Sequence, residues 1–452
     1  MKLFGTDGIR GDSSAFPFDN LTLKIIGRAI ARTLCDKKNI LIIRDTRESG
    51  KRIEKELAKG VIMGGAFPVF GGVMPTPSAS LLMRNGKYSA AIVISASHNP
   101  YMDNGIKIFN SKGFKLANSI EAKIENKINK YFSLKAVVSN KEISTKKNSK
   151  LLKFYENFII DNFIGRNLKG AKIVVDCANG ASYKSAPYVL KKIGATVIAL
   201  NIKPNGRNIN LNCGALHPEY ATETVRKYKA FCGFAFDGDA DRLICIDEKG
   251  IVRDGDFFLA SMACWLKSKK KLNNNILVST VMANAGLMNA MRKKKITVVI
   301  SAKIGDRYVI ANMKKHKASF GGEQSGHFIF KDILTTGDGI LSAVMLLSAL
   351  NETNKTMSEF MNVIEKFPQV IINKKVSEKI PIKKLSKSYR LIKTYEKLLS
   401  GVGRIFVRYS GTENILRIMV EGESMGEINT VAKNIANSIE KDIKFLNIAP
   451  YI

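Results

Sequence analysis

The segment AAIVISASHNP, residues 90–100, joins a short apolar run to a loop of small and polar residues. The run at 90–94 is rich in β-branched residues and predicts a buried strand. Open α/β sheets bind their ligands in loops at the carboxyl ends of their strands. The small residues at 95–97 let the backbone turn sharply there, and the Asn-Pro pair fixes the exit of the loop. The segment therefore predicts a functional loop in an α/β fold.

Four more short apolar runs predict buried strands, at residues 39–43, 171–176, 231–236 and 296–300. Helical patterns lie between them. At 22–35, for example, apolar residues from Leu23 to Leu34 repeat at spacings of three and four along one face. This alternation of strands and helices is typical of α/β units.

The length of 452 residues exceeds what one hydrophobic core usually serves, and about 150 residues per domain gives three or four domains. Lysine- and serine-rich stretches at about 138–149 and 367–387 interrupt the pattern and are expected to be connections. A turn-like stretch near 249–255 gives a further boundary. We therefore expect domains at 1–150, 151–250, 251–366 and 367–452.

The net charge of +33 is compatible with nucleic acid, anionic membranes or phosphorylated metabolites as partners. Lysines are spread along the whole chain and are not gathered beside aromatic residues in a nucleic-acid-binding module. We therefore expect a solvated basic surface, with no nucleic acid as the main partner.

The longest apolar run, 340–350, is shorter than the roughly 20 residues that span a bilayer, and it predicts a buried helix. Glycine and aspartate at positions 5–8 precede any apolar stretch, so no signal peptide is expected. The six cysteines lack C-x-x-C spacing and the four histidines lie far apart, which argues against disulfides and zinc. We expect a cytoplasmic protein that is not bound to a membrane.

In the first loop, Ser97 has His98 beside it and Lys107 close behind in sequence, an arrangement typical of an activated nucleophile with cationic support. An ordinary serine-rich turn explains the loop equally well.

The second loop, DGDADR at 237–242, carries aspartates at alternate positions after a predicted strand. Three carboxylates so close together repel one another unless a cation neutralises them, and oxygen ligands of this kind suit Mg²⁺. An EF-hand is the rival interpretation, because Glu248 falls at its position 12. That interpretation fails because Arg242 stands where glycine is needed and a predicted strand follows.

The third and fourth loops offer ligands for a sugar and for a phosphate. In GGEQSGH, 321–327, Glu323 and Ser325 supply acceptors and a donor for sugar hydroxyls, although a turn capped by Ser325 is the simpler alternative. In RYSGTE, 408–413, with Arg417 beyond it, a guanidinium, hydroxyls and turn amides could form a phosphate cradle. Weak surface salt bridges are the alternative for these arginines.

In their order and spacing the four loops resemble those of the α-D-phosphohexomutase superfamily, most closely its bacterial phosphoglucosamine mutase branch. The resemblance runs the length of the chain and includes the opening segment FGTDGIRG at 4–11. It implies three related α/β domains with mixed sheets and a smaller α+β C-terminal domain, in a heart-shaped arrangement. The domains would carry, in chain order, the phosphoserine, metal, sugar and phosphate loops.

The resemblance also implies a role for each matching residue. Ser97 is expected to be the phosphorylated residue and, through its phosphoryl oxygen, a metal ligand. The other residues fall into four groups: Mg²⁺ ligands Asp237, Asp239 and Asp241; reaction-site residues Lys107 (general acid/base), His98, Arg10 and Arg242; sugar-loop residues Glu323, Ser325 and His327; and phosphate-site residues Arg408, Ser410, Gly411 and Thr412, with Arg417 as a helper.

The activity implied is conversion of glucosamine 6-phosphate to glucosamine 1-phosphate through a 1,6-bisphosphate, feeding UDP-N-acetylglucosamine and cell-wall precursors. Gln324 favours this substrate, because phosphomannomutase/phosphoglucomutase relatives, the alternative, typically have methionine there. The expected cofactors are one Mg²⁺ and a hexose or glucosamine 1,6-bisphosphate as priming activator. The partner is a small sugar phosphate, and the protein is expected to be a monomer or homodimer. A metal-dependent phosphatase, a further rival, needs no second phosphate cradle.

Overall fold

The computed structural model describes residues 2–5, 7–35, 38–134, 143–165, 167–400, 403–409 and 414–448. The chain divides into two compact units. The first comprises Met1–Met282 and Lys294–Val363, and the second comprises Ala283–Lys293 and Ile364–Ile452. None of the described helices is long and apolar enough to cross a membrane.

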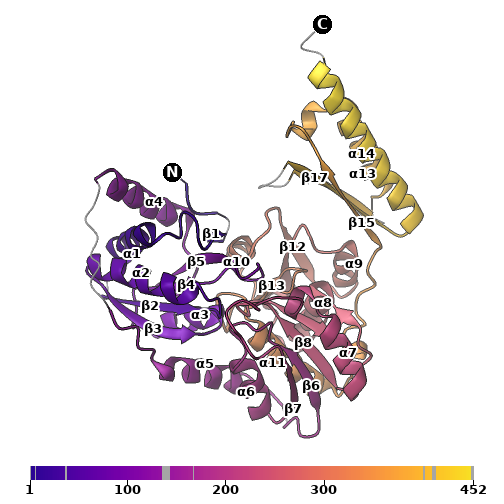
Figure 1. Ribbon diagram of the computed structural model, residues 1–452. Helices are drawn as coiled ribbons and strands as arrows, with labels where there is room; N and C mark the ends of the chain where they lie inside the picture. The colour runs from indigo at the N-terminus through magenta and orange to yellow at the C-terminus, as the bar shows by residue number, and fades with distance from the viewer. Residues whose placement is uncertain are drawn as a thin grey trace. The chain divides into compact units, whose positions relative to one another are not determined.

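The described part of the first unit contains three sheets (Figure 1). In each sheet, parallel strands lie at one edge and one or two antiparallel strands are added at the other edge. The N-terminal sheet has the order β1-β5-β4-β2-β3, with β2, β3 and β4 parallel. Its strands are β1 (Ile9–Asp12), β2 (Asn39–Arg44), β3 (Phe67–Val73), β4 (Ala90–Ile94) and β5 (Asp103–Asn110). All of β4 is buried, as its apolar sequence predicts.

The second sheet has the order β10-β9-β8-β6-β7, and the third has the order β12-β11-β13-β14. Strands β6, β7 and β8 are parallel, as are β11, β12 and β13, while β9, β10 and β14 pair antiparallel. Their bounds are β6 (Lys172–Asp176), β7 (Thr196–Leu200), β8 (Cys232–Phe236), β9 (Leu243–Ile246), β10 (Val252–Arg253), β11 (Ile276–Thr280), β12 (Thr297–Ser301), β13 (Phe320–Gly322) and β14 (Phe328–Phe330).

Helices connect and cover these strands. They are α1 (Asn20–Leu34), α2 (Gly50–Met63), α3 (Thr76–Arg84), α4 (Asn118–Ser133), α5 (Ser149–Asp161), α6 (Ser185–Lys192), α7 (Glu219–Tyr228), α8 (Gly255–Ser268), α10 (Asp306–Lys315), α11 (Gly339–Thr353) and α12 (Met357–Phe360). The buried helix expected at 340–350 is α11, whose residues from Gly339 to Leu350 are all buried.

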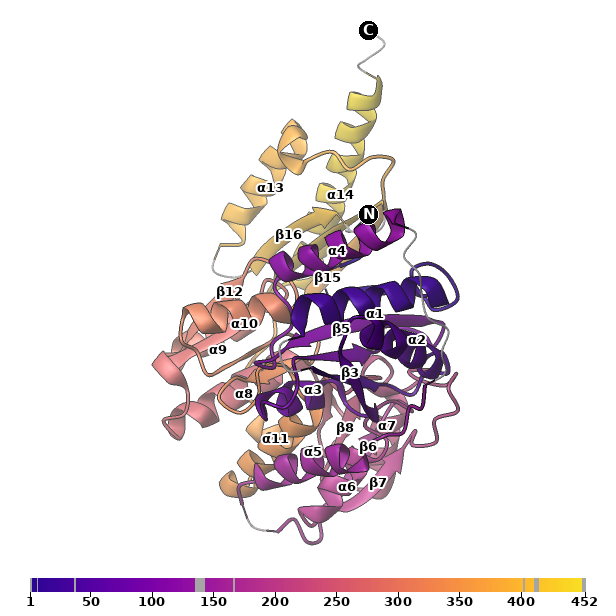
Figure 2. The ribbon, with the colours of Figure 1, turned by 90° about the vertical axis from the view of Figure 1, so that its left-hand side faces the viewer.

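Helices α1 and α2 lie side by side (Figure 2) because two glycines let their backbones meet. A Cβ on Gly27 would lie 2.2 Å from the carbonyl oxygen of Leu57, and one on Gly60 would lie 2.0 Å from that of Lys24. These distances leave no room for any side chain. The pair buries apolar residues of both helices in the core of the N-terminal sheet.

The second unit contains a three-stranded antiparallel sheet of order β15-β17-β16. Its elements are α9 (Ala285–Lys293), β15 (Gln369–Lys375), α13 (Ser386–Leu398), β16 (Gly403–Tyr409), β17 (Ile415–Gly422) and α14 (Met425–Ile448). Figure 2 shows α13 and α14 beside this sheet, with which they form an apolar core. Helix α9 lies between β11 and β12 in sequence but belongs to this unit, where the N–H of Ala285 donates to Glu421.

One expected connection is partly wrong. The stretch 367–387 contains β15, which pairs along its whole length with β17. It is an edge strand that alternates half-buried and exposed residues and ends in two lysines, a composition common at sheet edges. The connection expected at 138–149 falls partly on residues outside the described part of the chain.

Candidate active site

Ser97 lies in the loop after β4 with its backbone in the left-handed region, at φ 55°. This conformation is unfavourable for a residue with a side chain, so neighbouring contacts must hold it. The N–H of Ser97 donates to Ser95 Oγ at 3.0 Å, and Ser95 Oγ donates to Asp45 Oδ2 at 2.6 Å. Both serines are buried.

Arg47 binds the carbonyl oxygens of the same loop. Its guanidinium is fully buried and donates to the carbonyl oxygens of Ser97 at 3.0 Å and Asn99 at 2.9 Å, and also to that of Pro100. Its Nε donates to Asp45 Oδ2 at 2.9 Å. Asn210 Nδ2, in the segment between β7 and α7, also donates to the carbonyl oxygens of Ser97 and Asn99.

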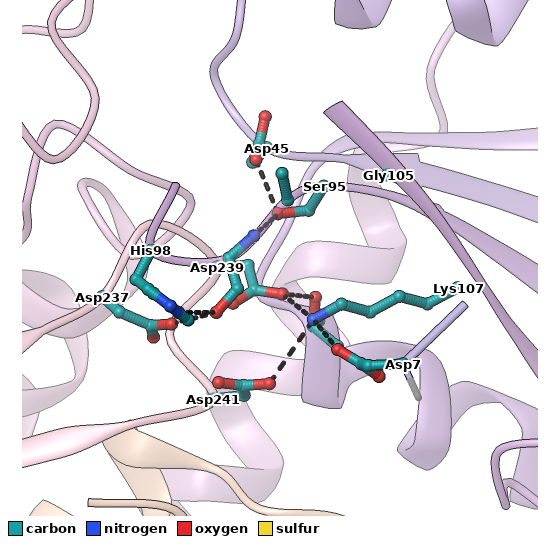
Figure 3. A network of polar contacts seen from close by, with 12 residues as sticks. Asp7, Asp45, Ser95, His98, Gly105, Lys107, Asp237, Asp239 and Asp241 are labelled. Carbon is teal, nitrogen blue, oxygen red and sulfur yellow. Dashed lines mark hydrogen bonds and ion pairs between the residues drawn. The ribbon is translucent and has the colours of Figure 1, made fainter. Parts of the chain in front are cut away.

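The three predicted metal ligands converge on one another (Figure 3). One carboxylate oxygen from each of Asp237, Asp239 and Asp241 lies within 4.8 Å of the others, and all three residues are buried. Ser97 Oγ donates to Asp237 Oδ2 at 2.6 Å. Burial and the two neighbouring aspartates raise the pKa of Asp237, a sign of crowded negative charge.

The donor set fits a hard divalent cation. Among the described residues, the buried Oδ1 atoms of Asp239 and Asp241 have no hydrogen-bond partner. Buried carboxylate oxygens rarely stay unbonded, and oxygen-only donors suit Mg²⁺. Glu248, the EF-hand position-12 residue, instead accepts hydrogen bonds from the backbone and side chain of Ser358 at the start of α12. The loop is therefore no EF-hand.

Lys107 projects from β5 toward the aspartates and is almost fully buried (Figure 3). Its Nζ lies 2.7 Å from Asp239 Oδ2, 3.4 Å from Asp7 Oδ2 and 3.5 Å from Asp241 Oδ2. Burial lowers its pKa, but the three carboxylates, Asp239 first, outweigh burial and the net shift is upward. The amine is therefore an ammonium in this arrangement.

His98, Arg10 and Arg242 surround the same centre. His98 Nδ1 lies 3.3 Å from Ser97 Oγ, and burial together with the nearby arginines lowers the pKa of His98 to about 4. Arg10 donates to the carbonyl oxygen of Ala96, and the N–H of Arg242 donates to Asp237 Oδ1. Within the described residues, the buried Nε atoms of both arginines lack a hydrogen-bond partner, so they are available to an anion.

The sugar loop follows β13. Glu323 is mostly buried, accepts the N–H of Gly305 at 3.0 Å, and has a pKa raised by burial. Ser325 is exposed. Gln324 Nε2 lies 3.4 Å from Asp254 Oδ2, at the start of α8, so its side chain binds the protein itself.

His327 is buried between two carboxylates. Its Nδ1 lies 3.7 Å from Asp241 Oδ1 and its Nε2 lies 3.6 Å from Asp306 Oδ2. Asp306 pairs with Lys115, which also binds Asp7, so one chain of charges links the metal loop with Lys107. The contacts of His327 support the metal loop, and its predicted contact with the sugar stays a prediction.

The second unit carries the predicted phosphate residues. Arg408 on β16 and Arg417 on β17 stand directly opposite each other in the antiparallel pair. Like charges in such a pair destabilise it unless an anion neutralises them. Burial and Arg417 lower the pKa of Arg408. Ser410, Gly411 and Thr412 lie outside the described residues.

Several residues of the site do not belong to any sequence motif, so the sequence alone does not identify them. Asp45 and Arg47 hold the Ser97 loop from the segment after β2, and Asn210 holds it from the segment between β7 and α7. Thr76 donates to Asp239 Oδ2 from the start of α3. They lie between 50 and 163 residues from their partners in sequence. Only the folded chain brings them together.

Four family models cover most of the chain. They describe the α/β/α domains I, II and III of phosphoglucomutase/phosphomannomutase, at residues 1–135, 153–250 and 254–367, and its C-terminal domain, at 371–438. Curated relatives include the phosphoglucosamine mutases of Syntrophotalea carbinolica, 42% identical over 98% of both chains, and Geobacter metallireducens, 44% identical over 98% of this chain and 99% of that one.

Solved structures share the fold. A phosphoglucomutase/phosphomannomutase family protein from Burkholderia thailandensis has a TM-score of 0.80 at 22% identity, over 97% of both chains. The Aspergillus fumigatus N-acetylphosphoglucosamine mutase, solved with GlcNAc-6P and magnesium, has a TM-score of 0.64 at 18% identity, over 98% of this chain and 96% of that one.

Proposed function

The chain belongs to the phosphoglucomutase/phosphomannomutase family, and from that premise we propose that it interconverts glucosamine 6-phosphate and glucosamine 1-phosphate. The observation that carries the proposal is the hydrogen bond of 2.6 Å from Ser97 Oγ to Asp237, within a buried cluster of three aspartates and Lys107. A carrier hydroxyl, an acidic metal loop and a buried cation are the parts that phosphoryl transfer requires.

Ser97 carries the transferred group in this proposal. A free hydroxyl of the sugar phosphate attacks the phosphorus on Ser97, the P–Oγ bond breaks, and a sugar bisphosphate forms. Lys107 is assigned to relay the proton: its ammonium gives a proton to Ser97 Oγ as the P–Oγ bond breaks, and the resulting amine takes the proton of the attacking sugar hydroxyl. In the second transfer Ser97 Oγ attacks the other phosphate of the bisphosphate and the bond between that phosphorus and the sugar oxygen breaks. Lys107 then relays the proton of Ser97 to the released sugar oxygen, which becomes a free hydroxyl.

The surrounding cations stabilise negative charge on the transferring group. The Nε atoms of Arg10 and Arg242, which have no hydrogen-bond partner in the described part of the chain, and the neutral His98 can donate to its oxygens. We propose that Asp237, Asp239 and Asp241 hold one Mg²⁺, which when bound neutralises charge on the phosphoryl oxygens. The left-handed backbone of Ser97, held by Arg47, presents Oγ to the metal loop.

The bisphosphate must turn end for end between the two transfers, so a second site must hold whichever phosphate is not reacting. We propose Arg408 and Arg417 for that site, with Ser410, Gly411 and Thr412. Glu323 and Ser325 orient the sugar hydroxyls. A 1,6-bisphosphate from solution primes the unphosphorylated enzyme.

Identity to curated phosphoglucosamine mutases favours the amino sugar. Gln324 supports this choice less than its sequence position suggests, because its side chain contacts Asp254. The alternative is phosphomannomutase/phosphoglucomutase activity. We further propose a cytoplasmic monomer or homodimer that supplies UDP-N-acetylglucosamine synthesis, with domains at 1–150, 151–250, 251–366 and 367–452.

The test follows glucosamine 6-phosphate with wild-type protein, Mg²⁺ and a trace of hexose 1,6-bisphosphate, beside Ser97→Ala. We expect glucosamine 1-phosphate from wild type and none from the variant. Conversion of glucose or mannose phosphates alone would support the alternative activity. Free phosphate as the main product would indicate a phosphatase.

A further inference from the structure

A polar cavity lies in the first unit, and none of the proposed catalytic residues lines it. It has a volume of about 580 Å³, within the range of roughly 300–1,000 Å³ common for small-molecule sites. We call it the basic cavity, because its lining includes the cationic side chains of Arg44, Lys51, Lys55, Lys147 and Lys184. Among the described lining residues Glu54 is the one carboxylate, and none of the catalytic residues takes part.

Three helices begin at the basic cavity. Lys51 is in the first turn of α2, Ser149 is the first residue of α5, and Lys184 is the N-cap residue of α6. None of these three first turns contains an acidic residue, and the N-caps of α2 and α6 make no side-chain capping bond. Helix N-termini carry partial positive charge and attract anions. Their charge adds to that of the five side chains.

The positive charge at the basic cavity is not a local run of lysines in the sequence. The cations come from separate segments, at the end of β2, on α2, before α5 and before α6. Within the described residues, Lys51 and Lys147 have no ion-pair partner within 4.0 Å. Like charges that converge on one cavity repel one another, and a bound polyanion removes that repulsion.

Glu54 adds an independent sign of a ligand. Its side chain is 6% exposed, and its Oε2 lies 3.4 Å from Arg44 Nε. Its Oε1 is buried and has no hydrogen-bond partner in the described part of the chain. A buried acceptor of this kind calls for a donor such as a hydroxyl group. We take Glu54 Oε1 as the acceptor for a hydroxyl group of the occupant.

The flat ring of Tyr183 lines the basic cavity and also an adjoining cavity of about 450 Å³. Arg44 and Lys51 line both cavities as well, so the two adjoin. Tyr183 is half-buried, and Lys184 Nζ lies over one face of its ring, 5.3 Å from the centroid. An aromatic ring beside a cationic groove can stack a heterocyclic base on its other face. We propose that the basic cavity binds a nucleoside diphosphate, with the diphosphate among the lysines, a ribose hydroxyl at Glu54 and the base against Tyr183.

Isothermal titration calorimetry tests this proposal on the full chain at fixed Mg²⁺. Ser97→Ala serves as the background, so that turnover does not interfere. The probes are UDP, inorganic pyrophosphate and uridine. We expect one UDP per chain, weaker binding of pyrophosphate, no measurable binding of uridine, and loss of UDP affinity as salt increases.

The decisive variant is Lys51→Gln with Lys147→Gln, in the same background. Two lost phosphate contacts should weaken UDP binding by about tenfold. The matched control replaces two exposed lysines elsewhere, Lys123→Gln with Lys433→Gln, and should bind UDP as the parent does. Each pair of lysine substitutions is also made in the enzyme that keeps Ser97. We expect both double variants to turn over at the wild-type rate, and this activity also shows that they fold correctly.

Four results would overturn the proposal. They are the absence of UDP binding, equal weakening in both lysine pairs, pyrophosphate binding as tight as that of UDP, and displacement of UDP by excess glucosamine 6-phosphate. The last result would place UDP at the catalytic site. Failure of the mutase assay would not affect these outcomes, because the titration does not measure turnover.

Discussion

At the scale of single residues, Arg47 accounts for the unusual backbone of Ser97. Its buried guanidinium binds the carbonyl oxygens of residues 97, 99 and 100, and Asp45 fixes it from the other side. Lysine at this position keeps the charge, but its compact ammonium lacks the planar fork of donors with which Arg47 reaches three carbonyl oxygens and Asp45 together. Arg47 therefore acts as a positioning residue for the Ser97 loop.

We predict that Arg47→Lys lowers kcat by about a hundredfold while the KM for the sugar phosphate changes little, because a misplaced carrier slows transfer without altering substrate binding. Steady-state kinetics measure both constants. Arg207→Lys is the control, since Arg207 is an exposed arginine paired with Glu48. Equal kcat values for Arg47→Lys and the control would contradict the assigned role.

The metal loop gives a second prediction at this scale. Removal of Mg²⁺ with a chelator should abolish turnover, and added Mg²⁺ should restore it. Asp239→Asn should raise the Mg²⁺ concentration needed for half-maximal rate by about tenfold or more, because it removes a charged ligand. The rate as a function of Mg²⁺ concentration measures this.

Glu248→Gln provides the matched control, because an EF-hand would use Glu248 and this loop does not. We expect the Mg²⁺ dependence of Glu248→Gln to equal that of wild type. If Glu248→Gln raised the Mg²⁺ concentration for half-maximal rate as much as Asp239→Asn does, the result would favour the EF-hand interpretation.

At the scale of elements, the sequence predicts strands and buried helices well where apolar periodicity is strong, as in β4 and α11. It fails at β15, where an edge strand rich in lysine resembles a connection. It also misses Asp7, Lys115 and Asp306, because their shared charge network joins residues up to about 300 positions apart. Local patterns carry no information about such contacts.

The contact between α1 and α2 is testable through Gly60. Alanine there would place its Cβ 2.0 Å from the Lys24 carbonyl oxygen, so the helices must separate. We predict a loss of stability of about 1–3 kcal/mol, measured by urea unfolding. Gly426→Ala on α14, where the nearest atom to the new Cβ is 3.9 Å away, should cost nothing. Similar losses in both variants would refute the packing argument.

Asp338, the N-cap of α11, gives a prediction about pH. Burial raises its pKa from 3.8 to about 7, although bonds from Leu341 and Tyr155 oppose this. Because the folded pKa lies above the unfolded one, wild type loses stability as pH rises from about 4 to 7. Asparagine at this position does not titrate. The free energy of unfolding of Asp338→Asn should therefore rise by a few kcal/mol relative to that of wild type between pH 4 and pH 8, as measured by urea unfolding. A difference between the two proteins that is independent of pH would contradict this.

At the scale of the whole molecule, the four loops singled out in the sequence follow strands of four different sheets. The Ser97 and Asp237 loops follow β4 and β8, the sugar loop follows β13, and Arg408 is on β16. The family of the chain could be inferred from the sequence because the four loops match those of the family in the same order. The contacts among the first three loops depend on how the three sheets of the first unit pack together.

The central claim is that Ser97 carries the phosphoryl group to the sugar. The direct measurement is a single turnover of enzyme labelled with ³²P on Ser97 and mixed with unlabelled glucosamine 6-phosphate and Mg²⁺. We predict that the label leaves Ser97 and appears first in the sugar bisphosphate and then in the monophosphate, and that Ser97→Ala takes up no label. Label that stays on the protein or appears as inorganic phosphate would contradict the account.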